Sequence, residues 1–151
     1  MTSLRRWIRR DRGSMAVEFV IAVPAIVFLL VLVSAGGQWL DLTGQFGSAA
    51  RDAVRAASLA RTFAAAQDDA QAAAAADLAG VCVGAPLKVT VQLIQGAGSV
   101  GPGDFATAQD ITVRLSCPAS LKAFHLIGLE PTQTFGDTAA APLDPFEDRT
   151  N

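Results

Sequence analysis

The sequence predicts an α+β protein: a long N-terminal membrane-spanning helix continuing into an alanine-rich helix, followed by a small antiparallel β-sheet. Three observations lead to this fold class. Residues 19–33 contain no charged or strongly polar side chain, alanines then recur at helical spacing through residues 46–64, and two later segments alternate apolar with polar residues. With 151 residues, the chain has room for one small domain at most.

Residues 1–13 form a basic leader, and residues 14–40 are predicted to be a transmembrane helix. The net charge of −2 combines +4 in the leader, which has five arginines and one aspartate, with −6 in the rest. An apolar run of this length can span a bilayer, where Pro24 is tolerated and Trp39 suits the interfacial aromatic belt. The arginines predict a single-pass protein with its N-terminus inside and its C-terminal domain outside the cytoplasmic membrane.

Residues 41–79 are predicted to continue as an extracytoplasmic alanine-rich helix that stops near Gly80 and frays over residues 67–76. Apolar residues at spacings of three and four, all but the first of them small, form one narrow stripe, namely Phe46, Ala50, Ala53, Ala57, Ala60 and Ala64. Packing against the chain's own sheet, packing against another subunit, and a plain alanine-rich surface helix all fit this stripe.

Residues 80–140 are predicted to be a small antiparallel β domain. The alternation in residues 87–93 and 111–115 predicts two strands, joined through a mobile glycine-rich loop at residues 95–104. Pro118 is expected to end the second strand, and residues 133–140 could form a third strand at the sheet edge. Residues 141–151 contain prolines and acidic residues and are predicted to be a flexible acidic tail.

The two cysteines, Cys82 and Cys117, are predicted to form a disulfide if this part of the chain is exported. Pairing the two strands as a hairpin sets Leu87 near Leu115 and brings both cysteines to the same end. Closing a loop of about 36 residues would stabilise the domain by roughly 3–4 kcal/mol in the chain-entropy model. Two free thiols are the alternative.

The sequence indicates a protein that is not an enzyme and that needs no cofactor or metal. His125 is the single histidine and lies in an apolar stretch at residues 124–129, where a packed or surface role is expected. Asp68 and Asp69 are adjacent on a helix and so point in different directions. The charge asymmetry suggests membrane topology rather than nucleic-acid binding.

The segment that organises the chain is Arg12-Gly13-Ser14-Met15-Ala16-Val17-Glu18-Phe19, followed by the apolar run. It resembles the prepilin-peptidase motif of type IV pilin-like proteins. Residues 48–57, with the sequence SAARDAVRAA, resemble the segment after the membrane helix in the TadE-like minor pseudopilin family of the tight-adherence (Flp, type IVb) pilus system.

This resemblance implies that a prepilin peptidase cleaves between Gly13 and Ser14 and that the mature protein takes part in pilus assembly. Its partners would be the membrane, that peptidase, and other pilin and pseudopilin subunits. Glu18 would be the assembly charge, since a carboxylate that enters an apolar filament core needs a partner such as the new Ser14 amine. Phe19 stands where tyrosine is frequent in the family. The chain contains no tyrosine and is longer than major subunits, which favours a minor or accessory role.

Other processing routes also fit the N-terminal segment. Val33-Ser34-Ala35 before Gly36 offers a signal-peptidase site, which would release a secreted protein. An uncleaved helix would leave a membrane-anchored envelope protein, and Arg5-Arg6 fits a twin-arginine signal only loosely.

Overall fold

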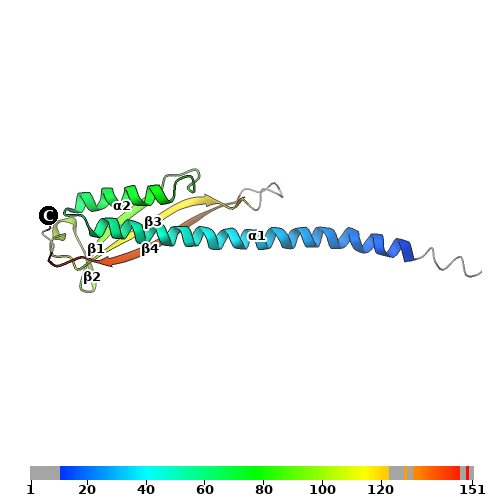
Figure 1. Cartoon of the computed structure of the whole chain (residues 1–151), viewed down its shortest axis with the longest axis horizontal. Coiled ribbons are helices and arrows are strands. Elements are labelled where there is room, and N and C mark those ends of the chain that lie inside the picture. The colour runs from blue at the N-terminus through cyan, green and yellow to red at the C-terminus, as the bar shows by residue number, and fades with distance from the viewer. Residues whose placement is uncertain (1–10, 123–127, 129–130, 147–148, 150–151) are drawn as a thin grey trace, which may run out of the picture.

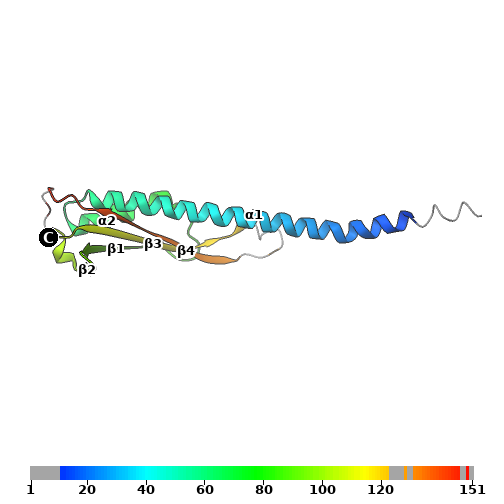
Figure 2. The same cartoon turned by 90° about the horizontal axis from the view of Figure 1, so that it is seen from below.

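The computed structural model describes residues 11–122, 128, 131–146 and 149, with side chains from residue 19 onward. Two helices, α1 (Asp11–Ser58) and α2 (Phe63–Asp77), precede a four-stranded antiparallel sheet. Its strands are β1 (Lys88–Gln95), β2 (Gly98–Val100), β3 (Asp110–Ser120) and β4 (Thr132–Pro142), in the order β2-β1-β3-β4. Figures 1 and 2 show α1 running far beyond the sheet and α2. The predicted α+β fold with a long N-terminal helix is therefore confirmed.

The helix expected over residues 41–79 is instead two helices. α1 ends at Ser58, and α2 begins at Phe63 after the N-cap residue Thr62, whose hydroxyl accepts a hydrogen bond from the Ala65 amide. α2 then folds back along α1 (Figure 1). Residues 67–76, expected to fray, are helical, because α2 is held there by buried Ala66, Ala70 and Ala74.

The alanine stripe forms the contact between α1 and the rest of its own chain. Phe46, Ala50, Ala53 and Ala57 are fully buried, and α1 contacts β4, β3 and α2. The small alanine side chains let the backbones approach closely, and Phe46 is the large fully buried residue of this stripe. Ala60 is buried in the turn after α1, whereas Ala64 is exposed on α2. Packing against the chain's own sheet is thus the alternative that holds for α1.

The hairpin predicted from the alternating segments is present as β1 paired with β3. Val89 lies opposite Leu115 and Val91 opposite Val113, so the register differs by two residues from the expected proximity of Leu87 and Leu115. Ile111, Val113 and Leu115 are buried against the helices. The glycine-rich segment is not simply a mobile loop, because it contains β2 and a 3₁₀ turn at Pro102–Asp104.

The C-terminal ends predicted for two strands, β3 and β4, are wrong, because both strands continue further. β3 continues through Pro118, whose carbonyl accepts a hydrogen bond from the Val83 amide at 2.8 Å on the side away from β4. In an antiparallel strand the N–H and C=O of one residue point to the same side. The N–H that proline lacks would therefore face Val83 and not β4, so Pro118 removes no hydrogen bond between β3 and β4. The expected tail at residues 141–151 begins inside β4. Leu143 is also buried, and its amide donates to the Gln109 carbonyl at 2.8 Å.

Candidate functional site

The backbone of residues 13–18 lies in the first turns of α1. Leader residues 1–10 and the side chains of Ser14 and Glu18 lie outside the described part of the chain, as does His125. Phe19 is the first described side chain and is 69% exposed. The segment that carries the predicted processing motif is therefore at the end of α1 that lies away from the sheet (Figure 1).

The next four turns of α1 present large apolar side chains to the outside. Among them, Phe28, Leu29 and Leu32 are each more than half exposed. The helix Phe19–Ser58 includes an 18-residue window with a mean hydropathy of 2.8, of which 11% is buried. Soluble monomers rarely expose a continuous apolar surface of this size. Its length and composition make α1 a candidate single-pass membrane anchor.

The contact between α1 and the sheet begins around Trp39. The Trp39 ring lies 4.7 Å from that of Phe135 in β4, and Phe46 lies 6.1 Å from the same ring. Trp39 is still 44% exposed, so it can also serve the interfacial role predicted for it. Val31 and Ala35 are buried, at 4% and 9% exposure. Spacings of four residues place them on the same helix face as Trp39.

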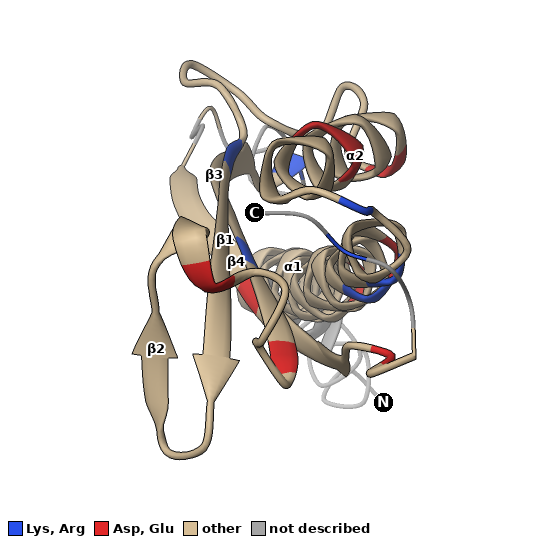
Figure 3. Ribbon diagram, turned by 90° about the vertical axis from the view of Figure 1, so that its left-hand side faces the viewer, with Lys and Arg blue, Asp and Glu red and all other residues tan. Residues whose placement is uncertain are grey.

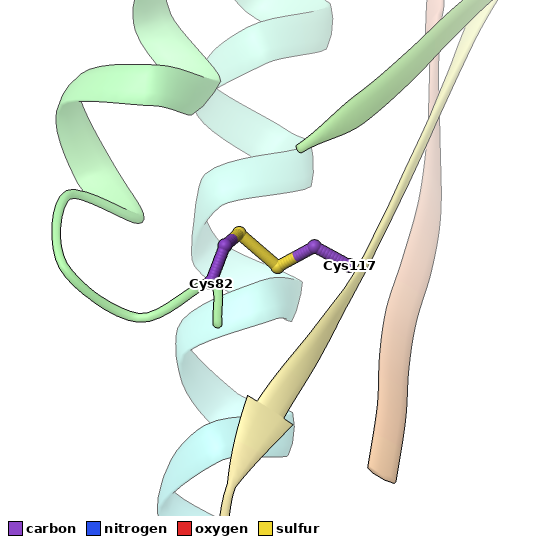
Figure 4. The surroundings of a disulfide bond; sticks show 2 residues. All are labelled: Cys82 and Cys117. Carbon is purple, nitrogen blue, oxygen red and sulfur yellow. A yellow bond between two sulfur atoms is a disulfide. The ribbon is translucent and has the colours of Figure 1, made fainter. Parts of the chain in front are cut away.

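The two cysteines lie together at the start of the sheet domain. The Cys82 and Cys117 sulfur atoms are bonded, with Cα atoms 5.6 Å apart, as the sequence predicted (Figure 4). Cys82 also forms an isolated bridge with Ala119. Since Cys117 pairs with Phe135 in the sheet, the disulfide fastens the connection after α2 to the strands that hold Trp39.

An open pocket that the sequence did not predict lies beside the end of the apolar run. Its volume is about 280 Å³, and Gln38, Asp41, Val81, Ser120 and Lys122 are among its lining residues. The Gln45 side-chain amide donates to the Asp41 carboxylate at 3.0 Å. Only the folded chain brings these residues together, because they come from α1, the connection after α2, and the end of β3. Among the described residues, no group of three or more His, Cys, Asp or Glu side chains could hold a metal ion.

Fold and site together define a small α+β domain on a candidate single-pass membrane helix. Comparison with protein families gives a match to TadE-like proteins over residues 13–55. The chain is thus TadE-like in this segment, and the resemblance predicted from the sequence is confirmed. The family points to a protein associated with the Tad pilus and is not known for enzymatic activity. No curated protein and no solved structure matches the chain.

Proposed function

We propose that this protein is a minor pseudopilin that takes part in the assembly of tight-adherence (Flp) pili and is processed by a prepilin peptidase after Gly13. One observation carries the proposal: the family match begins at Gly13, the residue before the proposed cleavage site, and ends at residue 55 within α1. The matched segment therefore contains the processing motif, the apolar surface and the start of the buried alanine stripe, the parts a pilin-like helix requires.

The proposed topology places the leader in the cytoplasm and the sheet domain outside. Five arginines precede the apolar run, and the next arginine in the sequence is Arg51. This asymmetry favours an inward N-terminus. The disulfide between Cys82 and Cys117 supports the same topology, because such bonds persist in oxidising compartments.

Cleavage at Gly13 would change the balance between membrane retention and assembly. Before cleavage, the +4 leader holds the N-terminus at the anionic inner leaflet. Cleavage removes that charge and creates an ammonium group on Ser14. This amine, from the same or a neighbouring subunit, would pair with the Glu18 carboxylate and set the axial register in an apolar filament core. Without the leader, the helix can pass from the bilayer into the assembly.

The position of each possible cleavage site in α1 also favours Gly13 over Ala35. A peptidase binds its substrate in an extended form, so the helix around the cleaved bond has to unwind. Gly13 lies near the N-terminal end of the described part of α1, away from the sheet domain (Figure 1). Ala35, in contrast, lies in the middle of α1 and is 9% exposed, so cleavage after it would require unwinding a long continuous helix.

N-terminal sequencing of the protein recovered from the producing cells tests the processing step. The mature chain should begin at Ser14, and Gly13→Leu should prevent this while Gly36→Leu, the matched control, should not. A chain that begins at Gly36 would instead support the secreted alternative, and an intact N-terminus in the parent protein would support a permanent anchor.

Substitution of Glu18 tests the role in assembly separately from processing. Glu18→Ala should leave cleavage largely intact but reduce piliation, because the carboxylate that pairs with the Ser14 amine is lost. Glu18→Asp keeps the charge and should retain most of the piliation, as counted by electron microscopy. Normal piliation in the cleaved Glu18→Ala variant would refute the register role.

A further inference from the structure

One end of the sheet lies beside the apolar half of α1. β4 runs in the same direction as α1, and β3 runs back towards the N-terminal end of that helix (Figures 1 and 2). Ser120, which ends β3, pairs with Thr132, which begins β4, and the Leu121 amide donates to the Pro131 carbonyl at 3.3 Å. We call these residues together with Lys122 the proximal end of the sheet; they are Ser120, Leu121, Lys122, Pro131 and Thr132.

The contact between β4 and α1 shows where the proximal end lies along the axis of α1. We call this position its height and give it as the α1 residue at the same level. A Cβ atom added to Gly47 would lie 3.0 Å from the Asp137 carboxylate, so these two residues are level along the helix axis. Thr132 precedes Asp137 by five residues, or about 16 Å of strand at 3.3 Å per residue. The same distance corresponds to about 11 residues of α-helix at 1.5 Å per residue. Thr132 therefore lies at about the height of Gly36.

Two α1 residues near and beyond this height, on the N-terminal side of Gly36, are buried. Ala35 is 9% exposed and Val31 only 4%, although neighbouring Leu32 and Val33 are more than half exposed. The helix is thus covered on one face for at least one turn beyond Gly36, towards its N-terminal end. That face is the one that carries Trp39 and contacts β4.

The same heights can be compared with the thickness of a bilayer. A hydrocarbon core of about 30 Å corresponds to roughly 20 residues of helix. Counted from Ser14, the core ends near residue 34, and counted from Phe19, the first residue after Glu18, it ends near residue 39. The proximal end, at the height of residue 36, falls at the outer boundary in the first case and inside the bilayer in the second.

We infer that the proximal end of the sheet is a second membrane-contacting surface, which rests in the interfacial layer of the outer leaflet beside α1. Its chemistry suits that layer: Lys122 is an exposed cation for lipid phosphates, and the exposed hydroxyl-bearing Thr132 tolerates partial hydration. Leu40 of α1, four residues from Gly36, is an apolar side chain near this height and is 73% exposed. This inference requires α1 to span a bilayer but does not depend on cleavage at Gly13 or on any role in pili.

Depth-dependent fluorescence quenching tests the inference in the full chain reconstituted into phosphatidylcholine vesicles. Both native cysteines are in a disulfide, so a single added cysteine can carry an environment-sensitive dye. Thr132→Cys and Lys122→Cys place the dye at the proximal end, and Phe28→Cys places it on the apolar half of α1. Ser99→Cys in β2 is the control, since β2 lies at the opposite end of the sheet (Figure 1).

Lipids that carry a spin label near the headgroup should reduce the fluorescence of the Thr132 and Lys122 dyes by at least about half, as expected for groups within a few ångströms of the quencher at that depth. The Ser99 dye should remain bright and should be quenched by aqueous iodide. If the Thr132 and Lys122 dyes respond like that at Ser99 while the Phe28 dye is quenched by lipid, the inference is wrong and the membrane span stands. If the Phe28 dye also responds only to iodide, both are wrong.

Discussion

The two halves of α1 differ in what surrounds them, although they form one continuous helix. In the half before Trp39, most described large side chains are exposed, with Phe28 at 66% and Leu29 at 58% exposure, and Val31 is buried. In the half after Leu40, the fully buried residues are mostly alanines, and Ala49 and Ala53 have no exposed surface. Large side chains are thus mostly exposed in the first half, and small side chains are buried in the second.

This difference shows that two different environments shape the two halves. We call the half of α1 before Trp39 the inner half and the half after Leu40 the outer half. The outer half packs against a sheet, where close approach of the backbones excludes water and small residues suffice. The inner half has no described partner over most of its surface, so its large side chains need lipid or other subunits around them. Figure 3, which looks along the molecule, shows α1 beside α2 with the sheet to one side of both helices. Among the described residues, the α1 members of the clustered domain core all come from the outer half.

The largest difference between the halves is expected for the two phenylalanines at positions 46 and 28. Phe46→Ala should destabilise the sheet domain by about 3–5 kcal/mol, because a fully buried aromatic ring is lost beside Phe135. Phe28→Ala removes the same atoms from an exposed position of the inner half and should change the stability of the domain by less than about 0.5 kcal/mol.

The measurement for this pair is denaturant unfolding of the full chain in detergent, followed by Trp39 fluorescence in a Trp7→Phe background. Trp39 reports on the domain because its ring contacts Phe135. Equal loss of stability in both variants would show that the inner half also packs against the domain and would contradict the division of α1 into two halves.

The disulfide should have the next largest effect, and only on the outer half. Replacing Cys82 and Cys117 with serine opens a loop with a sequence separation of 35 residues, which should cost roughly 3–4 kcal/mol in the chain-entropy model. The same unfolding measurement applies, with reduction of the parent protein as an independent way to remove the bond. Membrane insertion of α1 should not change. Loss of insertion in the serine variant would mean that the two halves depend on each other.

How much of the fold the sequence predicts depends on how far each signal is local. The strands at residues 87–93 and 111–115 follow from alternation, because the apolar face of β3 is buried and that of β1 is half-buried, packed against the core. The apolar half of α1 follows from composition alone. β2 and the continuation of β3 through Pro118 depend on neighbouring strands, in particular on which side of β3 is already paired. The local sequence around Pro142 predicts a solvated tail. The hydrogen bond of Leu143 to Gln109 cannot be predicted in this way, because the two residues are far apart in sequence.

The candidate site divides in the same way. Gly13, Ser14, Glu18 and Phe19 are recognisable as a linear motif, and the family match begins at its first residue. The pairing of Cys82 with Cys117 could be predicted because both flank alternating strands. The pocket beside Asp41 and the burial of Val31 depend on how the chain folds back, so no local pattern indicates them.

Alanine spacing does not predict the break between α1 and α2, because alanines occur on both sides of it, although Thr62 marks the start of the second helix. Its hydroxyl accepts a hydrogen bond from the Ala65 amide at 3.2 Å, and its backbone is extended.

Thr62→Ala should therefore destabilise the domain by about 1 kcal/mol, the smallest of the three effects, because one amide at the N-terminal end of α2 loses its partner. Thr43→Ala, on the exposed face of α1, is the matched control and should cost less, since its hydroxyl only shares the Trp39 carbonyl with the helix. Unfolding monitored by circular dichroism gives both values. Equal effects of the two substitutions would show that α2 is held by its buried alanines alone and that the cap does not decide where α2 begins.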